Sequence, residues 1–296
     1  MMKRGLLLAA ALALPFCAAG AAPRAVPADV AAAVSAPGRP ADAIALDAGR
    51  HPAEVLSFMG LRRGDRALDL FTGSGYYAEI MGRAVGPTGS VLAWEPTNFV
   101  NDRSRAGLAA LRSRTPNVAV LIAPADIVSF PTAAFDFVMI NLNYHDTYWQ
   151  SDRFHFPRMD PPAFLRSVFQ AMKPGATIAV VDHVANPGGD TRAVVEALHR
   201  IDPATVRADF ERAGFVFAGE SNILRNPHDD HSKLVFDPSI RGNTDRIVYR
   251  FRRPSQANRE GVWPRTRPSR PTRASTPSST RSPIRSVAPM PGPSGR

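Results

Sequence analysis

One short stretch constrains the fold of this 296-residue chain more than any other: "RALDLFTGSGYYAEIM", residues 66–81. An apolar run ends in Gly73 and Gly75 and passes directly into a helix-like segment. A strand, a glycine turn and a helix in this order are typical of a parallel sheet, in which the turn and the helix N-terminus face a ligand. The stretch therefore predicts an α/β fold with a small-molecule site at the turn.

The pattern continues along the chain, because short apolar runs alternate with helix-like segments from about residue 40 to residue 253. We expect seven strands, at 67–71, 90–95, 118–123, 135–141, 177–182, 215–224 and 246–251. Helices are expected at 51–59, 76–85, 104–114, 162–172 and 203–213. About 20 residues without a helical pattern join the last two strands, which should form an antiparallel hairpin. The predicted α/β domain is a Rossmann-like, seven-stranded, mostly parallel sheet with helices on both faces and a C-terminal antiparallel hairpin.

The two ends of the chain differ from this middle part. Within residues 1–22, Lys3 and Arg4 precede an apolar stretch, and small residues follow it. This order is typical of a secretory signal. We therefore expect an exported, periplasmic protein without stable membrane insertion after cleavage, with an uncleaved membrane anchor as the alternative. Residues 23–39 are expected to be a linker. Residues 254–296, rich in Pro, Ser, Thr and Arg, should form a disordered basic tail.

The net charge of +10 does not predict a nucleic-acid partner, because the charge lies at the ends. Residues 254–296 carry eight arginines and one glutamate, and the predicted domain is nearly neutral. The one cysteine, Cys17, lies in the predicted signal. The mature chain would therefore lack disulfides, a catalytic thiolate and cysteine-ligated zinc. Nothing in the sequence predicts the oligomeric state.

Acidic residues near the glycine turn indicate which ligand it holds. The turn "GSGYYA" fits the dinucleotide pattern G-x-G-x-x-G/A, and Glu95 follows about 20 residues later, where an acid can hold ribose hydroxyls. Both a nicotinamide dinucleotide and S-adenosylmethionine contain such a ribose. Asp69, inside the first strand, would repel a pyrophosphate but attract the ammonium group of a methionine moiety. This favours S-adenosylmethionine, with a structural pair between Asp69 and Arg66 as the alternative.

From about residue 50 to residue 253 the chain resembles the class I S-adenosylmethionine-dependent methyltransferases. "ALDLFTGSG" is similar to their first motif, with Phe71 in place of its first glycine, and "FDFVMINLNYHD" and "FLRSVFQAMKPGATIAVVDH" are similar to the segments through the fourth and fifth strands. Two later stretches, "HRIDPATVRADFERAGF" and "NPHDDHSKLVFDPSIRGNTDRIV", resemble a group of exported bacterial predicted methyltransferases. The resemblance implies that S-adenosylmethionine is held by Asp69, Phe71, Gly73, Gly75, Glu95, Asp126 and Asn141.

Within that set, the resemblance implies a role for each polar residue. Asp69 would meet the methionine ammonium, and Glu95 the ribose hydroxyls. Asp126, in "APADIVSF", would lie near the adenine amine. The glycines would allow the backbone to approach the cofactor, a freedom that phenylalanine at position 71 does not share.

The segment "NLNYHD", residues 141–146, follows the fourth predicted strand at the edge where open α/β sheets place their ligands. We expect it to bind the acceptor, with His145 as the leading base, since its pKa is ordinarily near neutral, and with Asn141, Tyr144 and Asp146 orienting the reaction. The alternative is a polar loop with a capping aspartate.

Three other histidine-containing positions are less informative. "HDDH", residues 228–231, contains metal-ligand types, but consecutive residues cannot easily all turn onto one ion, so we expect a solvated lid or turn and no metal site. His183 ends the fifth predicted strand and is a minor candidate for a base. His199 is expected to pack or to cap a helix.

The function predicted from the sequence is methyl transfer from S-adenosylmethionine to a small-molecule oxygen, nitrogen or carbon nucleophile. One alternative is a nicotinamide-dependent oxidoreductase, for which Asp69 is an unfavourable residue. The other is a non-catalytic protein that binds S-adenosylmethionine.

Overall fold

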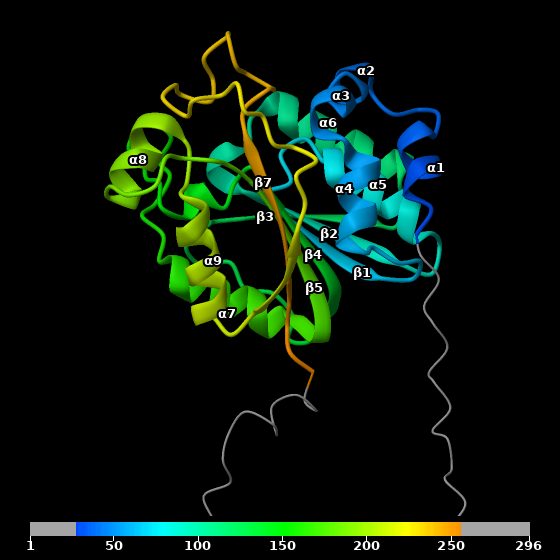
Figure 1. Cartoon of the computed structure of the whole chain (residues 1–296). Coiled ribbons are helices and arrows are strands. Elements are labelled where there is room, and N and C mark those ends of the chain that lie inside the picture. Colours follow the sequence, from blue (N-terminus) through cyan, green and yellow to red (C-terminus); the bar gives the residue numbers. More distant parts are fainter. Residues whose placement is uncertain (1–27, 256–296) are drawn as a thin grey trace, which may run out of the picture.

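The computed structural model describes residues 28–255, so the predicted signal and all but the first two residues of the predicted tail lie outside the described residues. A seven-stranded sheet has the strand order β3-β2-β1-β4-β5-β7-β6 (Figure 1). The first five strands are parallel, and β7 runs antiparallel to both β5 and β6. The predicted fold and its antiparallel C-terminal hairpin are confirmed. The strands are β1 (Arg66–Leu70), β2 (Ser90–Pro96), β3 (Val118–Ala123), β4 (Phe135–Asn141), β5 (Met172–His183), β6 (Val216–Glu220) and β7 (Arg246–Arg252).

Helices cover both faces of the sheet. In Figure 1, α4 and α5 lie on one side of the strands and α7 and α9 on the other. The helices are α1 (Val30–Ser35), α2 (Ala41–Ile44), α3 (Asp47–Arg50), α4 (Pro52–Met59), α5 (Tyr76–Val85), α6 (Asp102–Arg114), α7 (Pro161–Ala171), α8 (Thr191–Leu198) and α9 (Pro203–Arg212), with the short 3-10 turns η1 (Thr97–Phe99) and η2 (His145–Thr147). Among residues 28–255, no helix has both the length and the apolar character that a membrane crossing requires.

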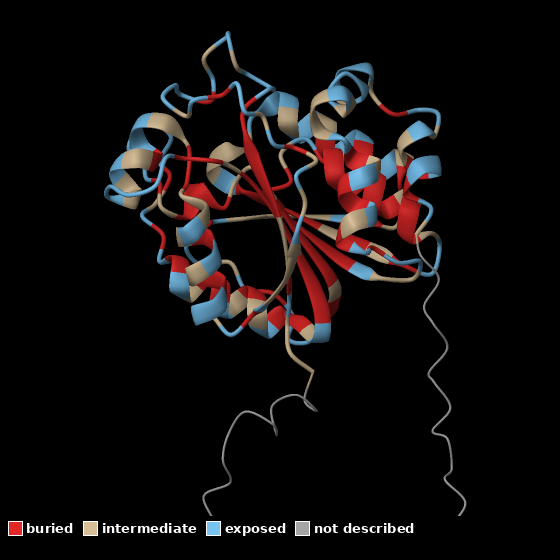
Figure 2. Ribbon diagram, viewed as in Figure 1, coloured by how far each residue is buried: buried red, intermediate tan, exposed pale blue. Residues whose placement is uncertain are grey.

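Two apolar cores form because successive strand residues point to opposite faces. In β1, Ala67 packs in the core that contains α4 and α5, whereas Leu68 and Leu70 pack in the core that contains α7 and α9. Figure 2 shows the central strands as almost entirely buried, as expected for parallel strands covered on both sides. Asp69 is the one polar residue among the buried residues of β1, and only 3% of its surface is exposed.

The structure corrects the predicted linker (residues 23–39) over residues 28–39, the part of it that the structure describes. Val30–Ser35 forms α1, which begins after Asp29, whose carboxylate accepts a hydrogen bond from the Ala32 backbone N–H at 3.0 Å. Val30 and Ala33 are buried, and α1 packs against α4 and α5. The domain therefore includes residues before position 40. The small side chains of this alanine-rich helix allow it to approach its neighbours closely.

Candidate functional site

The glycine turn connects β1 to α5 at the carboxyl edge of the sheet. Phe71, Gly73 and Gly75 have φ angles of +55°, +61° and +87°, so all three adopt left-handed backbone conformations. Glycine does so freely, whereas phenylalanine is strained there. The Phe71 ring is 5% exposed and lies 4.7 Å from the Trp94 ring, centroid to centroid. Packing of the ring therefore holds Phe71 in a backbone conformation that glycine would adopt without strain.

Two buried carboxylates flank this turn. Asp69 accepts a hydrogen bond from Thr72 Oγ1 at 2.6 Å, and Glu95 accepts one from the Gly73 backbone N–H at 2.7 Å. Burial raises the pKa of each carboxylic acid to about 7, although these hydrogen bonds act in the opposite direction. Arg66 is exposed at the start of β1, and Asp69 bonds to Thr72 instead of forming the structural pair considered from sequence.

Three observations fit this turn to S-adenosylmethionine. Buried carboxylates with raised pKa values favour a ligand that supplies positive charge and hydroxyl donors. A Cβ atom added to Gly73 would meet no described atom within 4 Å. The hydroxyl of Tyr77, whose pKa is raised by burial and also by the charge of Asp69, has no hydrogen-bond partner among the described residues. Open space beside Gly73 thus lies near two buried carboxylates and near one hydroxyl, that of Tyr77, that has no partner among the described residues.

The remaining predicted cofactor residues occupy the same edge of the sheet. Asp126 is exposed in the turn that follows β3, and the partly buried Asn141 ends β4. Since β3 and β4 lie on opposite sides of the β2–β1 pair, the candidate residues follow four neighbouring strands. Contacts of Asp126 and Asn141 with the cofactor stay a prediction.

His145 is held between two carboxylates. Its backbone N–H donates to Asp182 at 2.8 Å, its ring Nδ1 lies 2.7 Å from the other oxygen of Asp182, and its Nε2 lies 3.4 Å from Asp146 Oδ1. Burial lowers the pKa of His145, but the charges of Asp182 and Asp146 and the hydrogen bond to Asp182 outweigh it and raise the pKa to about 9. In this state the ring carries a proton at neutral pH, which disfavours the predicted role of a free base.

The structure does not bring Tyr144 to this group. The Tyr144 side chain is fully buried, its hydroxyl donates to Asp209 at 2.8 Å, and its ring packs 5.0 Å from that of Phe210. Both contacts lie on α9, in the core on the far side of the sheet from α5. Tyr144 therefore has a packing role in place of the predicted orienting one, because adjacent residues of this loop turn in different directions.

A cavity of about 370 Å³ opens beside His145 and Asp146. The cavity is lined by Phe99, Leu142, Asn143, His145, Asp146, Trp149, Phe154, His183, His199, Val235 and Phe236. Phe99 connects it to the glycine turn, since the rings of Phe99 and Phe71 lie 6.4 Å apart, centroid to centroid. The acceptor-side candidates His145 and Asp146 thus share a cavity that adjoins the turn.

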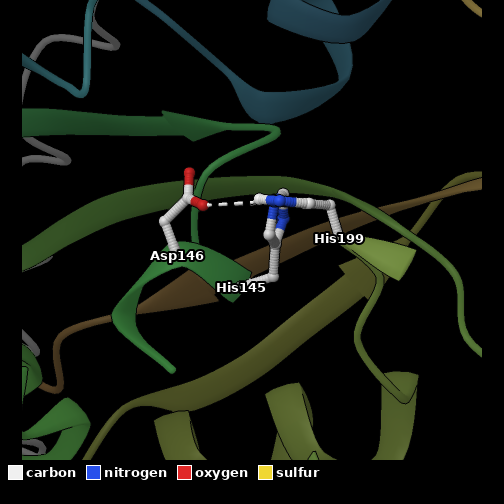
Figure 3. A group of neighbouring side chains, drawn as sticks. All are labelled: His145, Asp146 and His199. Atoms are coloured by element: carbon white, nitrogen blue, oxygen red, sulfur yellow. Dashed lines mark ion pairs between the residues drawn. The ribbon is translucent and has the colours of Figure 1, made fainter. Parts of the chain in front are cut away.

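Sequence reasoning missed Asp182 and undervalued His199. Asp182, the residue before the last of β5, has a fully buried carboxylate, and the acid in "VVDH" at the carboxyl end of a predicted strand was its signal. His199 does terminate α8, with a φ of +49°, but its Nδ1 also lies 3.7 Å from Asp146 Oδ1 (Figure 3). His183, the minor candidate, lines the same cavity with its Nδ1 2.7 Å from Thr244 Oγ1.

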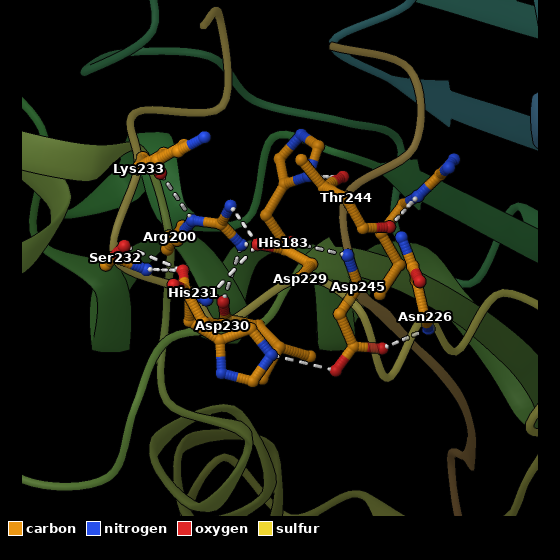
Figure 4. A network of polar contacts seen from close by, with 12 residues as sticks. His183, Arg200, Asn226, Asp229, Asp230, His231, Ser232, Lys233, Thr244 and Asp245 are labelled. Atoms are coloured by element: carbon orange, nitrogen blue, oxygen red, sulfur yellow. Dashed lines mark hydrogen bonds and ion pairs between the residues drawn. The ribbon is translucent and has the colours of Figure 1, made fainter. Parts of the chain in front are cut away.

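The "HDDH" segment belongs to a structural network (Figure 4). Asp229 accepts hydrogen bonds from both terminal nitrogens of Arg200, at 2.9 and 3.0 Å, and from the Asp245 backbone N–H at 2.7 Å. The ring of His231 lies between Asn186 and Asp245, with 3.0 Å to each. These contacts tie the β6–β7 loop to the end of α8 and the start of β7.

Comparison with known proteins identifies relatives of the first half of the domain. Residues 44–142 match the family model of Protein-L-isoaspartate(D-aspartate) O-methyltransferase (PCMT). The protein-L-isoaspartate O-methyltransferase of Ignicoccus hospitalis is 39% identical over 80 residues, 27% of this chain and 37% of that protein. The ubiquinone/menaquinone biosynthesis C-methyltransferase UbiE of Pasteurella multocida is 31% identical over 126 residues, 42% of this chain and 41% of that protein. The match thus spans about two fifths of the length of these relatives.

Solved structures show the same fold over most of the described domain. The cyclase SpnF has a TM-score of 0.51 at 16% identity, covering 70% of this chain and 81% of that one. A chain in the complex of the Haloferax volcanii Trm112 methyltransferase activator with a methyltransferase has a TM-score of 0.50 at 17% identity, covering 77% and 99%. The chain has the fold of the class I S-adenosylmethionine-dependent methyltransferases and is related to methyltransferases in sequence, which implies S-adenosylmethionine as its cofactor.

Proposed function

We propose that the protein transfers a methyl group from S-adenosylmethionine to a small, largely apolar acceptor. The observation that carries the proposal is the cavity of about 370 Å³ beside His145 and Asp146, which Phe99 connects to the glycine turn. Glu95 on β2, beside the turn, has a pKa that burial raises most and to which the charge of Asp146 in the cavity also contributes. Cofactor and acceptor would therefore meet in one place.

Each polar residue at the turn has a task in holding the cofactor. Asp69 would accept hydrogen bonds from the methionine ammonium, and Glu95 from the ribose hydroxyls. When bound, S-adenosylmethionine supplies an electrophilic methyl group on a good leaving group. The protein then has to align the acceptor and exclude water, which can supply most of the rate acceleration.

Aromatic rings favour an apolar, planar acceptor. Trp149 and Phe99 line the cavity, their ring centroids 6.2 Å apart. Phe154 and Phe236 also line it, yet 50% and 52% of their surfaces are exposed, which is high for side chains of this size. We place these two rings at the mouth of the cavity, where they would contact an entering acceptor.

Two other functions use the same fold. A nicotinamide-dependent oxidoreductase would have to place a pyrophosphate beside Asp69, whose negative charge disfavours it. A protein that binds the cofactor without transferring its methyl group is the second alternative, because the structural neighbour SpnF is a cyclase and a fold does not determine its chemistry. Detection of a methylated product separates methyl transfer from both.

The site of action outside the cytoplasm is also a proposal. Its support is the composition of residues 1–22 and the resemblance to an exported bacterial group. Fractionation of cells that express the full chain tests it.

The proposed cofactor should bind more tightly than NAD(H), and Glu95→Gln should weaken it about 10- to 100-fold. The amide can still accept the Gly73 N–H, but it loses charge-assisted hydrogen bonds worth about 1.5 to 3 kcal/mol. Isothermal titration calorimetry measures both ligands, with Glu54→Gln as the control, since 54% of the Glu54 side chain is exposed on α4. Unchanged affinity in Glu95→Gln, or tighter binding of NAD(H), contradicts the proposal.

Binding of S-adenosylmethionine should strengthen as the pH rises through about 7. Below that pH, Asp69 is mostly protonated and cannot attract a cation, because burial raises its pKa to about 7 while Thr72, Ala78 and Arg50 lower it. If only the ionised form binds, affinity should be about tenfold lower at pH 6 than at pH 8.

If S-adenosylmethionine binds only when Asp69 is ionised, a protonated Asp69 must release its proton on binding. Calorimetry at pH 6.5 in two buffers of different ionisation enthalpy measures that release, and Asp69→Asn should reduce it. Tighter binding at pH 6 than at pH 8 contradicts the assignment of Asp69 to the cationic part of the ligand.

A further inference from the structure

We propose that His145, Asp146 and His199 form a binding site for a divalent transition-metal ion, for which zinc is the best-suited probe. One ligand atom of each residue lies within 4.8 Å of those of the other two (Figure 3). The sequence led us to expect no metal site, because the only cluster it showed was the consecutive "HDDH". This site goes beyond the proposed methyl transfer and does not depend on it.

The spacing of these atoms fits metal ligands better than hydrogen-bond partners. Asp146 Oδ1 lies 3.4 Å from His145 Nε2 and 3.7 Å from His199 Nδ1, longer than the usual hydrogen bond of about 2.7 to 3.2 Å. Two ligands bound to one zinc ion at about 2.1 Å in tetrahedral geometry stand roughly 3.4 Å apart. An ion among the three atoms would therefore need only small movements of the side chains.

Neighbouring residues hold His145 and Asp146 so that one ligand atom of each is left for the proposed ion. Asp182 contacts Nδ1 of His145 at 2.7 Å, which leaves Nε2 as the ligand nitrogen. Asn143 donates to Oδ2 of Asp146 at 2.7 Å, which leaves Oδ1. A carboxylate behind a ligating histidine is the usual outer-shell partner in metal sites. Asp182 and Asn143 thus have the positions of orienting residues.

The aromatic cavity lining orients the third ligand. The ring of His199 packs between Trp149 and Phe236, with 5.2 Å between its centroid and that of each neighbour. His199 adopts a left-handed backbone conformation with a φ of +49°, which is strained for a residue other than glycine. Strain of this kind is often found at functional sites, and here it brings the ring to Asp146.

Burial and charge favour a cation at this point. His145 and Asp146 are 3% and 5% exposed, and the carboxylates of Asp146 and Asp182 lie on either side of the His145 ring. The protonated ring of His145 compensates only one of these two carboxylates in the metal-free protein, and a divalent ion that replaces its Nε2 proton would compensate both. The ligand set, two histidines and one carboxylate, is that of catalytic zinc sites, in which a fourth position stays open. The cavity adjoins all three ligands and could place an acceptor oxygen or nitrogen there.

Metal titration of the full chain, freed of metal with a chelator, tests the site. Zinc should bind at one equivalent per chain in competition with a chromophoric chelator, and cobalt should give the visible absorption of a four- or five-coordinate site. Asp146→Asn and His199→Gly should each weaken zinc binding at least 100-fold, more than the 10- to 100-fold typical of outer-shell changes. Zinc should also raise the melting temperature of the natural chain but not of these two variants.

His51→Gly is the matched control, because His51 also caps helices in a left-handed conformation, with a φ of +43° and 45% of its side chain exposed. It should bind zinc like the natural chain. The Asp146→Asn substitution changes no side-chain volume, and circular dichroism of each variant shows whether it is folded. The proposal is overturned if the natural chain does not bind zinc, if folded Asp146→Asn still binds it, or if His51→Gly loses it to the same extent.

Discussion

Arg200→Met should lower the free energy of unfolding by about 3 to 5 kcal/mol, because it leaves a buried carboxylate without its counter-ion. Arg200 is fully buried and holds both oxygens of Asp229, which is 5% exposed. It also donates to the carbonyl oxygens of Val184 and Lys233, at 3.0 and 2.9 Å. No water can replace these donors at a fully buried position, so the cost should be close to the full value for a broken buried pair.

Urea denaturation of Arg200→Met and of the control Arg207→Met measures this difference. Arg207 forms an ion pair with Glu211 at 3.0 Å, but 50% and 46% of the two side chains are exposed. Exposed pairs contribute at most about 1 kcal/mol. Adding Asp229→Asn to Arg200→Met should recover part of the stability by removing the unpaired charge. Equal losses in the two arginine variants would show that the network does not stabilise the domain.

This network also bears on the candidate site. Arg200 follows His199 directly, and its partners Asp229 and Lys233 lie in the loop that carries Val235 and Phe236 to the cavity. One buried ion pair thus holds two separate segments of the cavity lining against each other (Figure 4). A loop fixed in this way is less free to open than the solvated lid that its sequence suggested.

Features set by local sequence and by sheet geometry were predictable. The alternation of apolar runs predicted all seven strands, and the helix expected at 203–213 is α9, which Asp202 caps by accepting the Ala204 N–H at 2.8 Å. The proximity of Asp69 and Glu95 also followed from sequence, because neighbouring parallel strands end at the same edge. The structure bears out that proximity, since Asp69 and Glu95 accept hydrogen bonds from the adjacent residues Thr72 and Gly73.

Side-chain directions in the loops were not predictable, because they depend on single backbone torsions and on distant partners. Leu142 has a φ of +60°, and a few residues further Tyr144 turns toward α9 while His145 turns toward Asp182. No local pattern distinguishes these two neighbours. The contact of His199 with Asp146 joins segments separated by α7, β5 and α8, so it depends on the whole fold.

Gly75→Ala should destabilise the domain by about 2 to 5 kcal/mol. A Cβ at position 75 would lie 2.4 Å from Cδ2 of Leu111, which is fully buried in α6. Overpacking of this kind costs about 1 to 3 kcal/mol. The φ of +87° adds about 1 to 2 kcal/mol for a residue with a Cβ. Thermal and urea denaturation measure the loss, and a variant as stable as the natural chain would show that the turn can rearrange.

Gly73→Ala should separate binding from folding at the same turn. Its Cβ would meet no described atom within 4 Å, so only the strain of its φ of +61° remains, about 1 to 2 kcal/mol. If S-adenosylmethionine approaches the backbone here, that methyl group takes space the ligand needs, and a clash of about 1 to 3 kcal/mol weakens binding roughly 5- to 150-fold. Calorimetric titration of this folded variant provides the test. Position 73 would then need glycine because a ligand comes close, and position 75 because Leu111 does. Full affinity in Gly73→Ala would instead show that the cofactor does not approach the turn at this position.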